Sequence, residues 1–285
     1  MSIKICVITP ISHLNTFAHL GEFDMVLSHL VLENGGNNSY AQYYREQREK
    51  GRFILLDNSL FELELQGRGV GIDACLDAAE IIHPNEIIAE DILFDGEKTI
   101  ESTKRFIQKM IDRGVFGKYQ IMGVAQGKTK QEWWDCFERL LDLPIDTIGL
   151  SKLAVPVSYS GEKESPGCVS MSRIMCVEDI AHRYRFDAET INGKRIHLLG
   201  GDNWLPREIN QQKRYKWIRS NDSSAAVWYG RHNKVFNDEG KIRDIILNKP
   251  DLENKDPDTS YALDKVGVQA DIFENIIHWH LASKD

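Results

Sequence analysis

Acidic and amide side chains repeatedly follow runs of apolar residues, and their types suit acid–base and nucleophilic chemistry. In the stretch RFILLDNSLFEL, residues 52–63, a buried-strand pattern ends at Asp57. Asp91, Gln126 and Asp222 follow apolar runs in the same way. A carboxylate can transfer a proton or attack as a nucleophile. Each Asp alone is a common turn former or helix cap, and only their repeated placement favours a catalytic site.

Eight apolar runs are predicted to be the strands that position these side chains. Most are rich in Ile, Val and Leu on both faces, which favours buried parallel strands. The runs lie at 3–9, 24–30, 52–57, 85–91, 119–126, 145–151, 195–201 and 216–222. Helix-like segments lie between them at roughly 39–50, 73–83, 97–113, 129–142, 171–185 and 206–214. Only the segment between the first two strands lacks a good helix pattern.

This alternation predicts an α/β fold, a (β/α)8 TIM-type barrel over residues 1–247. A doubly wound open sheet is the alternative, but no GxGxxG turn follows the first strand. In a barrel of this type, chemistry takes place at the carboxyl ends of the strands. We therefore expect Asp57, Asp91, Gln126 and Asp222 to converge there.

Several loop and end features are also predicted. Asp73, Thr129 and Asp202 are expected to be helix N-caps. Residues 156–167, after the sixth strand, form a polar loop insertion long enough to act as a lid.

The C-terminal part, residues 248–285, is predicted to be a linker followed by a helix that packs on the barrel. The linker covers 248–260 and the helix lies near 269–282. The residues expected to make the contact are Ile272, Phe273, Ile276 and Ile277.

The composition is that of an ordinary globular protein, with 285 residues, 42% hydrophobic and 27% charged. Its 35 basic and 43 acidic residues give a net charge of −8, so any nucleic-acid partner must meet a local patch. The five cysteines have no CxxC spacing, which favours reduced thiols over a metal site. The sequence has neither a signal peptide nor an apolar membrane segment, so it predicts a cytoplasmic protein. We also expect no metal and no cofactor.

Six motifs carry a family resemblance. In chain order they are LLDNSLFE, IIAEDILF, MGVAQG, LSKLAVP, HLLGGDNWLPREI and SNDSSAAVWYGR. They resemble the strand-end motifs of the tRNA-guanine transglycosylases, in particular the phage and bacterial enzymes that insert 7-deazaguanine bases into DNA. The resemblance covers roughly residues 50–231. Each motif is weak alone, but six in order are specific.

The resemblance implies a base-exchanging pentosyltransferase, acting in the host cytoplasm if phage-encoded, with a role for each matching residue. Asp222 is the nucleophile and Asp57 the general acid/base, while Asp91 and Gln126 read the base edge. The other candidate base-binding residues are Asn58, Phe61, Lys152, Leu153, Leu199 and Gly200. Phe61 and Leu199 would sandwich the base. Lys152 lies where the family has Gly-Gly, and the family pattern does not explain it.

The implied reaction exchanges guanine for a base such as 7-cyano-7-deazaguanine through a covalent aspartyl–deoxyribosyl intermediate, with retained configuration. Asp222 must be ionised to attack, and a raised pKa would suit Asp57 as the proton donor. Asp91 can accept the paired N–H donors of guanine. A 7-deazaguanine has no ring nitrogen at position 7 to protonate, so we expect the exchange to be nearly irreversible.

Two features favour DNA over tRNA as the substrate. No cysteine follows Cys176, so the zinc module of the tRNA enzymes is missing. Residues 211–234 contain six cations, which are predicted to bind DNA: Lys213, Arg214, Lys216, Arg219, Arg231 and Lys234. They alternate with aromatic residues that could stack on bases, namely Tyr215, Trp217, Trp228 and Tyr229. The alternative for this stretch is a solvated helix surface with core aromatics.

Three other functions stay open. One is an RNA transglycosylase that lacks the zinc module. Another is a non-catalytic barrel that binds nucleobases or DNA. The third is a nucleoside hydrolase, in which water replaces the incoming base.

Overall fold

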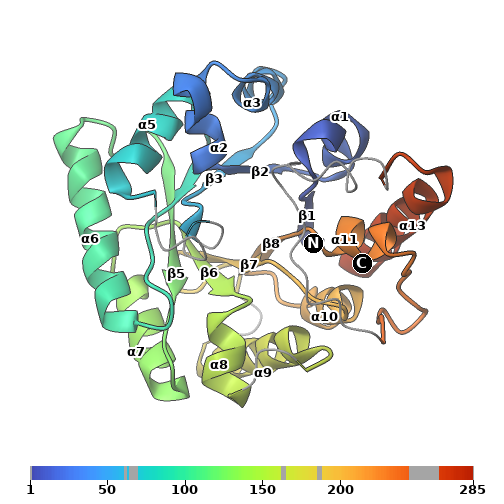
Figure 1. Ribbon diagram of the computed structural model, residues 1–285. Coiled ribbons are helices and arrows are strands. Elements are labelled where there is room, and N and C mark those ends of the chain that lie inside the picture. The colour runs from blue at the N-terminus through green and yellow to red at the C-terminus, as the bar shows by residue number, and fades with distance from the viewer. Residues whose placement is uncertain are drawn as a thin grey trace. The chain divides into compact units, whose positions relative to one another are not determined.

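The computed structural model describes residues 2–60, 63, 70–161, 165–184, 188–243 and 263–284. Eight parallel strands alternate with helices along the chain (Figure 1), as in an α/β (β/α)8 TIM-type barrel, and the predicted fold is confirmed. The chain divides into two compact units. We call Phe23–Gly149 the central unit, and Met1–Glu22 with Leu150–Asp285 the terminal unit.

The central unit contains strands that pair in parallel in the order β2-β3-β4-β5. One row of the sheet runs from Val26 through Leu56 and Ile87 to Ile121. All four side chains are buried, and so are Met25 and Leu55 in the next row, which point to the other face, so apolar residues occupy both faces of the strands. The elements of this unit are β2 (Asp24–Leu27), α2 (Ser28–Leu32), η3 (Glu33–Gly36), α3 (Ser39–Glu49), β3 (Ile54–Asp57), α5 (Ile72–Ile82), β4 (Glu86–Ile88), α6 (Gly96–Asp112), β5 (Gln120–Ala125) and α7 (Lys130–Leu141).

The elements of this unit test three predictions. The second apolar run does not stay extended to residue 30, because the chain turns into α2 at Ser28. The predicted cap at Thr129 is confirmed, since its side chain accepts the backbone N–H of Glu132. The predicted cap at Asp73 is wrong. Gly71, with φ of 81°, is the N-cap of α5, and Asp73 lies inside the first turn.

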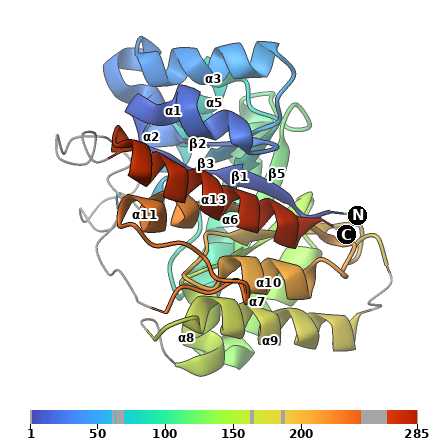
Figure 2. The same cartoon turned by 90° about the vertical axis from the view of Figure 1, so that its right-hand side faces the viewer.

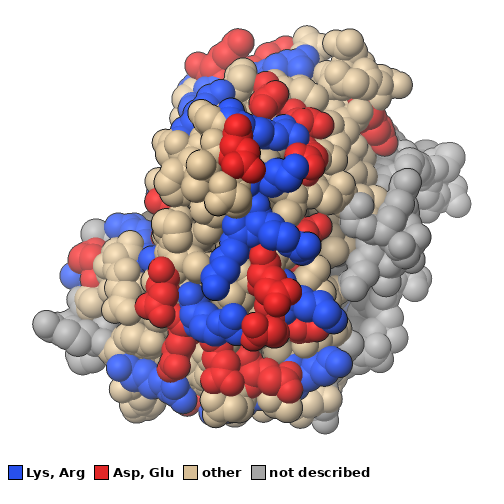
Figure 3. All heavy atoms as spheres, turned by 90° about the vertical axis from the view of Figure 1, so that its left-hand side faces the viewer, with Lys and Arg blue, Asp and Glu red and all other residues tan. Residues whose placement is uncertain are grey.

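Asp73 instead belongs to a surface ion-pair network. Its carboxylate pairs with Lys109 of α6 and with Arg113, the C-cap of that helix. Arg113 also pairs with Asp77. These pairs hold the pKa of Asp73 below its usual range, chiefly through the hydrogen bond from Arg113. On the face of the molecule that includes α6, cationic and anionic side chains are intermixed (Figure 3). Such a face offers no single-sign surface for a nucleic acid.

The terminal unit contains the parallel strands β7, β8 and β1, paired in that order. The strand β6 (Thr147–Ser151) runs across the boundary between the two residue ranges. The other elements are β1 (Lys4–Val7), η1 (Ile11–His13), α1 (Leu14–Phe17), η2 (Ala18–Leu20), α8 (Ala154–Ser160), α9 (Cys168–Arg183), β7 (Arg195–Leu199), α10 (Leu205–Gln212), β8 (Ile218–Ser223), α11 (Ala225–Arg231) and α13 (Val266–Ser283).

The final helix α13 lies against α11 and α10 (Figure 2). Ile272 and Ile276 are buried as predicted. Ile277 is 57% exposed and Phe273 38% exposed, so the prediction that all four apolar residues pack inward is wrong for Ile277 and only partly right for Phe273. The helix buries one face, and these two residues turn away from its centre. The predicted linker at 248–260 lies outside the described residues.

The predicted lid after β6 is not a loop over its first part. Pro156 and the residues up to Ser160 belong to α8, in which Pro156 and Ser158 are buried. Proline is tolerated in the first turn of a helix, which is where Pro156 lies. Residues 162–164 of the predicted lid lie outside the described residues.

All five cysteines lie in described segments, where each is buried and none forms a disulfide. Among the helices in the described part of the chain, none combines the length and apolar character needed to cross a membrane.

Candidate active site

In the central unit, Asn58, Asp91 and Gln126 form a buried hydrogen-bonded group, which we call the Asp91 cluster. The three residues follow β3, β4 and β5. Asn58 Nδ2 donates to Asp91 Oδ1 at 2.9 Å, and Gln126 Nε2 donates to Asp91 Oδ2 at 2.6 Å. Neighbouring parallel strands end at the same edge, so the predicted approach of Asp91 and Gln126 is confirmed.

Burial raises the pKa of Asp91 to about 6, and the hydrogen bonds from Asn58 and Gln126 oppose that rise. The negative charge of Glu90 adds slightly to it. The carboxylate form therefore predominates at neutral pH. Each oxygen of this carboxylate already faces a donor.

Backbone groups fix the orientation of both amides in the Asp91 cluster. The N–H of Phe94 can only donate, and it meets Gln126 Oε1 at 3.0 Å, so the NH₂ group of Gln126 must face Asp91. Asn58 Oδ1 likewise accepts from the N–H of Leu60 at 2.9 Å. Phe94 has a φ of 62°, which is rare for a bulky residue. The chain thus holds Phe94 in a strained conformation at the point where it orients Gln126.

Asp57 is the last residue of β3 and its side chain is partly exposed. Its charge adds to the effect of burial, which raises the pKa of the Cys75 thiol well above its usual range. The proton-transfer role of Asp57 stays a prediction. Phe61, the predicted stacking residue, lies outside the described residues.

In the terminal unit, Asp222 lies near the end of β8 and is held through one oxygen. Asp222 Oδ1 meets His197 Nε2 at 2.9 Å and the N–H of Gly200 at 3.1 Å. His197 Nδ1 meets Ser220 Oγ at 2.8 Å. We call His197, Gly200, Ser220 and Asp222 the Asp222 cluster. His197 is fully buried and Asp222 is 3% exposed.

Strand geometry explains this cluster. Ser220 and Asp222 are two residues apart in β8, so both side chains point to the same face of the sheet. His197 of β7 pairs in register with Ser220. The segment after β7 then brings the backbone of Gly200 to Asp222.

The turn at Leu199 and Gly200 is fixed by buried side chains. Arg173 of α9 donates to the carbonyl oxygens of Leu199 and Gly200, each at 2.8 Å. Asn221 Nδ2 donates to the carbonyl of Gly200 at 2.9 Å. Arg173 also forms an ion pair with Glu208 at 2.7 Å, in which both side chains are fully buried. Burial nevertheless raises the pKa of Glu208 to about 7.

Lys152 has a structural neighbour that the family pattern did not suggest. Gly200 has a φ of 70°, and a Cβ atom placed there would lie 2.4 Å from Lys152 Cδ. The aliphatic stem of Lys152 therefore passes directly over Gly200. The backbone N–H of Lys152 donates to the carbonyl of Leu199 at 3.1 Å, and Leu153 is the N-cap of α8.

Part of the predicted DNA-binding stretch lies away from Asp222 along β8. Lys213, Arg214 and Lys216 precede this strand, whereas Asp222 lies near its carboxyl end. Ile218, which follows Lys216 by two residues, already lies roughly 13 Å from Asp222 along the strand. Arg214 pairs with Glu178, and Lys216 pairs with Glu189 at 3.1 Å. The closeness of these cations to Asp222 in sequence does not make them neighbours in space.

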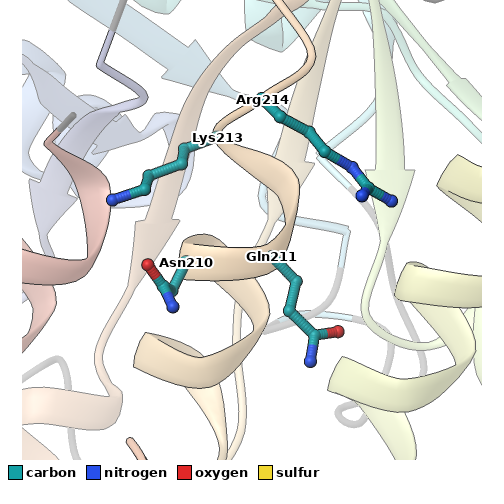
Figure 4. Close-up of a pocket in the computed structure, with 4 residues that line it drawn as sticks. All are labelled: Asn210, Gln211, Lys213 and Arg214. Atoms are coloured by element: carbon teal, nitrogen blue, oxygen red, sulfur yellow. The ribbon is translucent and has the colours of Figure 1, made fainter.

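Lys213 and Arg214 line a pocket of about 350 Å³ at the end of α10, together with Asn210 and Gln211 (Figure 4). Their side chains point in opposite directions. Arg231 and Lys234 are placed differently, since they lie at and after the end of α11, which follows β8. Arg219 lies in β8 itself, and its Nε donates to Ser220 Oγ at 3.1 Å.

The aromatic residues of the same stretch are buried. Tyr215, Trp217, Trp228 and Tyr229 are all at most 7% exposed. Tyr215 stacks on Trp217, with ring centroids 5.0 Å apart. The core-aromatic alternative therefore holds for these four rings, which leaves little surface on which a base could stack.

Asp202 is not the predicted N-cap of α10, because Trp204 takes that position, although Asp202 Oδ1 accepts the backbone N–H of Trp204 at 2.9 Å. Its other oxygen, Oδ2, accepts the backbone N–H groups of Val169 and Ser170, at 3.1 and 3.3 Å, in the first turn of α9. It thus caps a helix that precedes it by more than thirty residues. A carboxylate stabilises such an end through both the hydrogen bonds and the helix dipole.

Sequence reasoning missed His197 and Arg173. His197 stands in an apolar strand, two residues before Leu199, so both side chains point to the same face of the sheet. A single polar residue on that face is the signal that could have revealed His197. Arg173 lies in a helix with no comparable pattern. Comparisons with models of known protein families and with curated proteins find no match to this chain. A functional assignment therefore depends on the geometry of the two clusters and on the motif resemblance.

Proposed function

We propose that this protein is a base-exchanging transglycosylase that removes guanine from DNA and inserts a 7-deazaguanine base, such as 7-cyano-7-deazaguanine. The observation that carries the proposal is the carboxylate of Asp222, whose hydrogen bonds from the described residues, His197 and Gly200, both reach Oδ1. Such a carboxylate keeps its second oxygen for attack on the anomeric carbon of deoxyribose. The motif resemblance assigns Asp222 the same role.

The proposed reaction has two displacements. Asp222 attacks the anomeric carbon, the bond to guanine breaks, and Asp57 supplies the proton that the departing base needs. The incoming 7-deazaguanine then loses a proton to Asp57 and attacks the same carbon, which releases Asp222. Two inversions give net retention. The product base lacks N7, so it leaves poorly and the exchange is nearly irreversible.

The Asp91 cluster suits guanine-like bases. The pairing edge of guanine presents two adjacent N–H donors, which one carboxylate can accept together. Gln126 Nε2 uses one hydrogen on Asp91, and its second hydrogen can go to the exocyclic oxygen of the base. Adenine would place an acceptor against Asp91 and leave a buried charge unpaired.

DNA is the proposed polymer for two reasons. In the tRNA enzymes a cysteine-rich module follows the nucleophile, whereas residues 223–285 of this sequence contain no cysteine. Deoxyribose also lacks the electron-withdrawing 2′-hydroxyl, so positive charge develops more easily at the reacting carbon. Of the six cations predicted to bind DNA, Arg231 and Lys234 are the best placed, because they follow β8 on its carboxyl side.

The test is mass spectrometry of nucleosides after incubation of the protein with DNA or tRNA and a panel of 7-deazaguanines. We expect a 7-deazaguanine deoxynucleoside in DNA and equimolar release of guanine. Modification of tRNA alone would instead identify an RNA transglycosylase, and guanine release without incorporation a hydrolase. Binding without any chemistry, unchanged in Asp222→Ala, would identify a non-catalytic barrel.

A further inference from the structure

We infer that His197 is a positioning residue for Asp222, and that a hydrogen-bond chain from Arg219 through Ser220 and His197 to Asp222 fixes the tautomer of His197. The catalytic part of this inference rests on the proposed function. The chain itself consists of three contacts within the terminal unit: Arg219 Nε to Ser220 Oγ at 3.1 Å, Ser220 Oγ to His197 Nδ1 at 2.8 Å, and His197 Nε2 to Asp222 Oδ1 at 2.9 Å.

The chemistry of its two ends gives the chain a direction. The guanidinium of Arg219 can only donate, so Ser220 Oγ accepts from it. The carboxylate of Asp222 can only accept, so His197 Nε2 must carry a hydrogen. The hydroxyl hydrogen of Ser220 is then directed to Nδ1, which accepts it. The result is a neutral imidazole protonated on Nε2.

The strands make this arrangement rigid. His197 is fully buried and Ser220 is 2% exposed. The pairing of β7 with β8 shifts between Ile196 and His197, so that Ile196 lies opposite Ile218 and His197 opposite Ser220. Arg219 is thus the extra residue of a β-bulge, an irregularity that re-aims side chains near active sites. Side chains held on strands keep their geometry better than those on loops.

A neutral donor suits a nucleophile that loses its charge. When Asp222 forms an ester with the sugar, its negative charge disappears. A cationic partner at the same place would then be left buried and unpaired, which is costly. A neutral imidazole keeps its hydrogen bond to Oδ1, which becomes the carbonyl oxygen of the ester.

The chain also identifies the reacting atom. Among the described residues, two donate to the carboxylate of Asp222, namely His197 and Gly200, and both reach Oδ1. Oδ2 is therefore the oxygen that attacks. Arg219, predicted from the sequence to contact DNA, takes a different role as the first donor of the chain.

The tautomer can be tested without any substrate. Long-range ¹H–¹⁵N spectra of protein labelled with ¹⁵N-histidine report which ring nitrogen carries hydrogen, and the spectrum of His197→Gln assigns the signal. We expect hydrogen on Nε2 alone in the unmodified protein. In Ser220→Ala we expect Nε2 to keep its hydrogen, because Asp222 still accepts it, and the Nδ1 signal to shift, because Nδ1 loses its donor. Any form of His197 that carries hydrogen on Nδ1 in the unmodified protein would overturn the chain.

The positioning role is tested by two substitutions. His197→Phe removes the donor to Asp222, whereas the amide of His197→Gln can place an N–H close to the position of Nε2. We expect His197→Phe to lower kcat by about 10- to 100-fold with little change in KM for the incoming base, and His197→Gln to recover most of that loss. His280→Gln is the matched control, since His280 contacts the carbonyl of Leu20 and not the Asp222 cluster.

An unchanged kcat in a folded His197→Phe protein would overturn the positioning role. Thermal unfolding of each variant shows whether it folds. Ser220→Ala, a smaller structural change, is a second variant, and we expect it to lower kcat several-fold. The two proposals can fail separately. If the unmodified protein exchanges no base on any substrate, the proposed function fails, while the spectra still decide the hydrogen-bond chain.

Discussion

Asp91 in the central unit and Asp222 in the terminal unit are both buried carboxylates at or after strand ends, yet they are held differently. Asp91 receives one side-chain amide on each oxygen, from Asn58 and Gln126. Asp222 receives both of its donors, His197 and Gly200, on a single oxygen. The first arrangement fixes the whole plane of the carboxylate, and the second leaves the other oxygen without a hydrogen bond from any described residue.

This difference matches two kinds of chemical work. A carboxylate that recognises two adjacent donors needs both oxygens in place before the ligand arrives, which lowers the ordering cost of binding. A nucleophile needs one oxygen free and the other held. The Asp91 cluster is built from side chains, whereas the Asp222 cluster also depends on a backbone turn. Substitutions in the two clusters should therefore have different effects on base exchange and on stability.

The largest effect is expected for Asp222→Asn. Asparagine has nearly the same shape and its oxygen can keep the bonds from His197 and Gly200, but it is not a nucleophile. We expect base exchange to fall by at least about 10⁴-fold and the covalent DNA adduct to disappear, with little change in stability. Asp238→Asn, at an exposed position, is the control. A covalent adduct in Asp222→Asn would assign the nucleophile to another residue.

The next largest effect is expected for Arg173→Met, which tests the dependence of the Asp222 cluster on its turn. The substitution leaves Glu208 buried without its cation and removes the donors to the carbonyls of Leu199 and Gly200. Breaking such a pair costs about 3–5 kcal/mol. Urea unfolding measures the loss, and the double variant Arg173→Met/Glu208→Gln should recover part of it. Equal stability of Arg173→Met and the unmodified protein would contradict this view of the turn.

Asp91 should make stability depend on pH. Burial raises its pKa to about 6 in the folded protein, above the ordinary value of 3.8. The folded state therefore binds this proton more tightly than the unfolded state, and stability falls as pH rises from about 4 to about 6. The full change is about 3 kcal/mol. Asp91→Asn should remove this component.

Urea unfolding at pH 4.5, 5.5 and 7 measures the effect. Glu208, whose pKa is raised to about 7, also makes the free energy of unfolding fall as pH rises. The informative quantity is therefore the difference in this pH dependence between Asp91→Asn and the unmodified protein. Asp238→Asn should leave the slope unchanged. A slope that survives in Asp91→Asn would place the titrating group elsewhere.

The fold and the Asp91 cluster could be predicted from the sequence because both follow from local rules. Runs of Ile, Val and Leu between amphipathic segments specify buried parallel strands, and residues just after adjacent strands must lie near one another. Asp91 and Gln126 meet for that reason. No knowledge of the exact register was needed.

The Asp222 cluster could be predicted only in part. The contact between His197 and Asp222 depends on a register shift between β7 and β8, which no sequence pattern announced. Asp202 could not be assigned to α9 from the sequence, because the N–H groups of α9 that it accepts lie more than thirty residues earlier in the chain. Long-range hydrogen bonds of single polar side chains leave no periodic signal, so they appear only when the chain is folded.

The smallest effect is expected for Gly200→Ala, which tests the turn at its closest approach. Alanine at a φ of 70° costs about 1 kcal/mol, and its Cβ would also displace the stem of Lys152. Gly193→Ala is a matched control in the same unit, because Gly193 has a φ of 79° and no atom within 4 Å of an added Cβ. Unfolding of both variants separates backbone strain from crowding.

We expect Gly200→Ala to be less stable than Gly193→Ala by about 1 kcal/mol, and Lys152→Ala to reduce that difference when combined with it. Base exchange should fall in Gly200→Ala and not in Gly193→Ala, because a shifted turn moves the N–H of residue 200 that holds Oδ1 of Asp222. A loss of exchange as large in Gly193→Ala would mean that the whole terminal unit, and not this contact, controls the nucleophile. Retention of full activity in Gly200→Ala would leave His197 as the donor that matters.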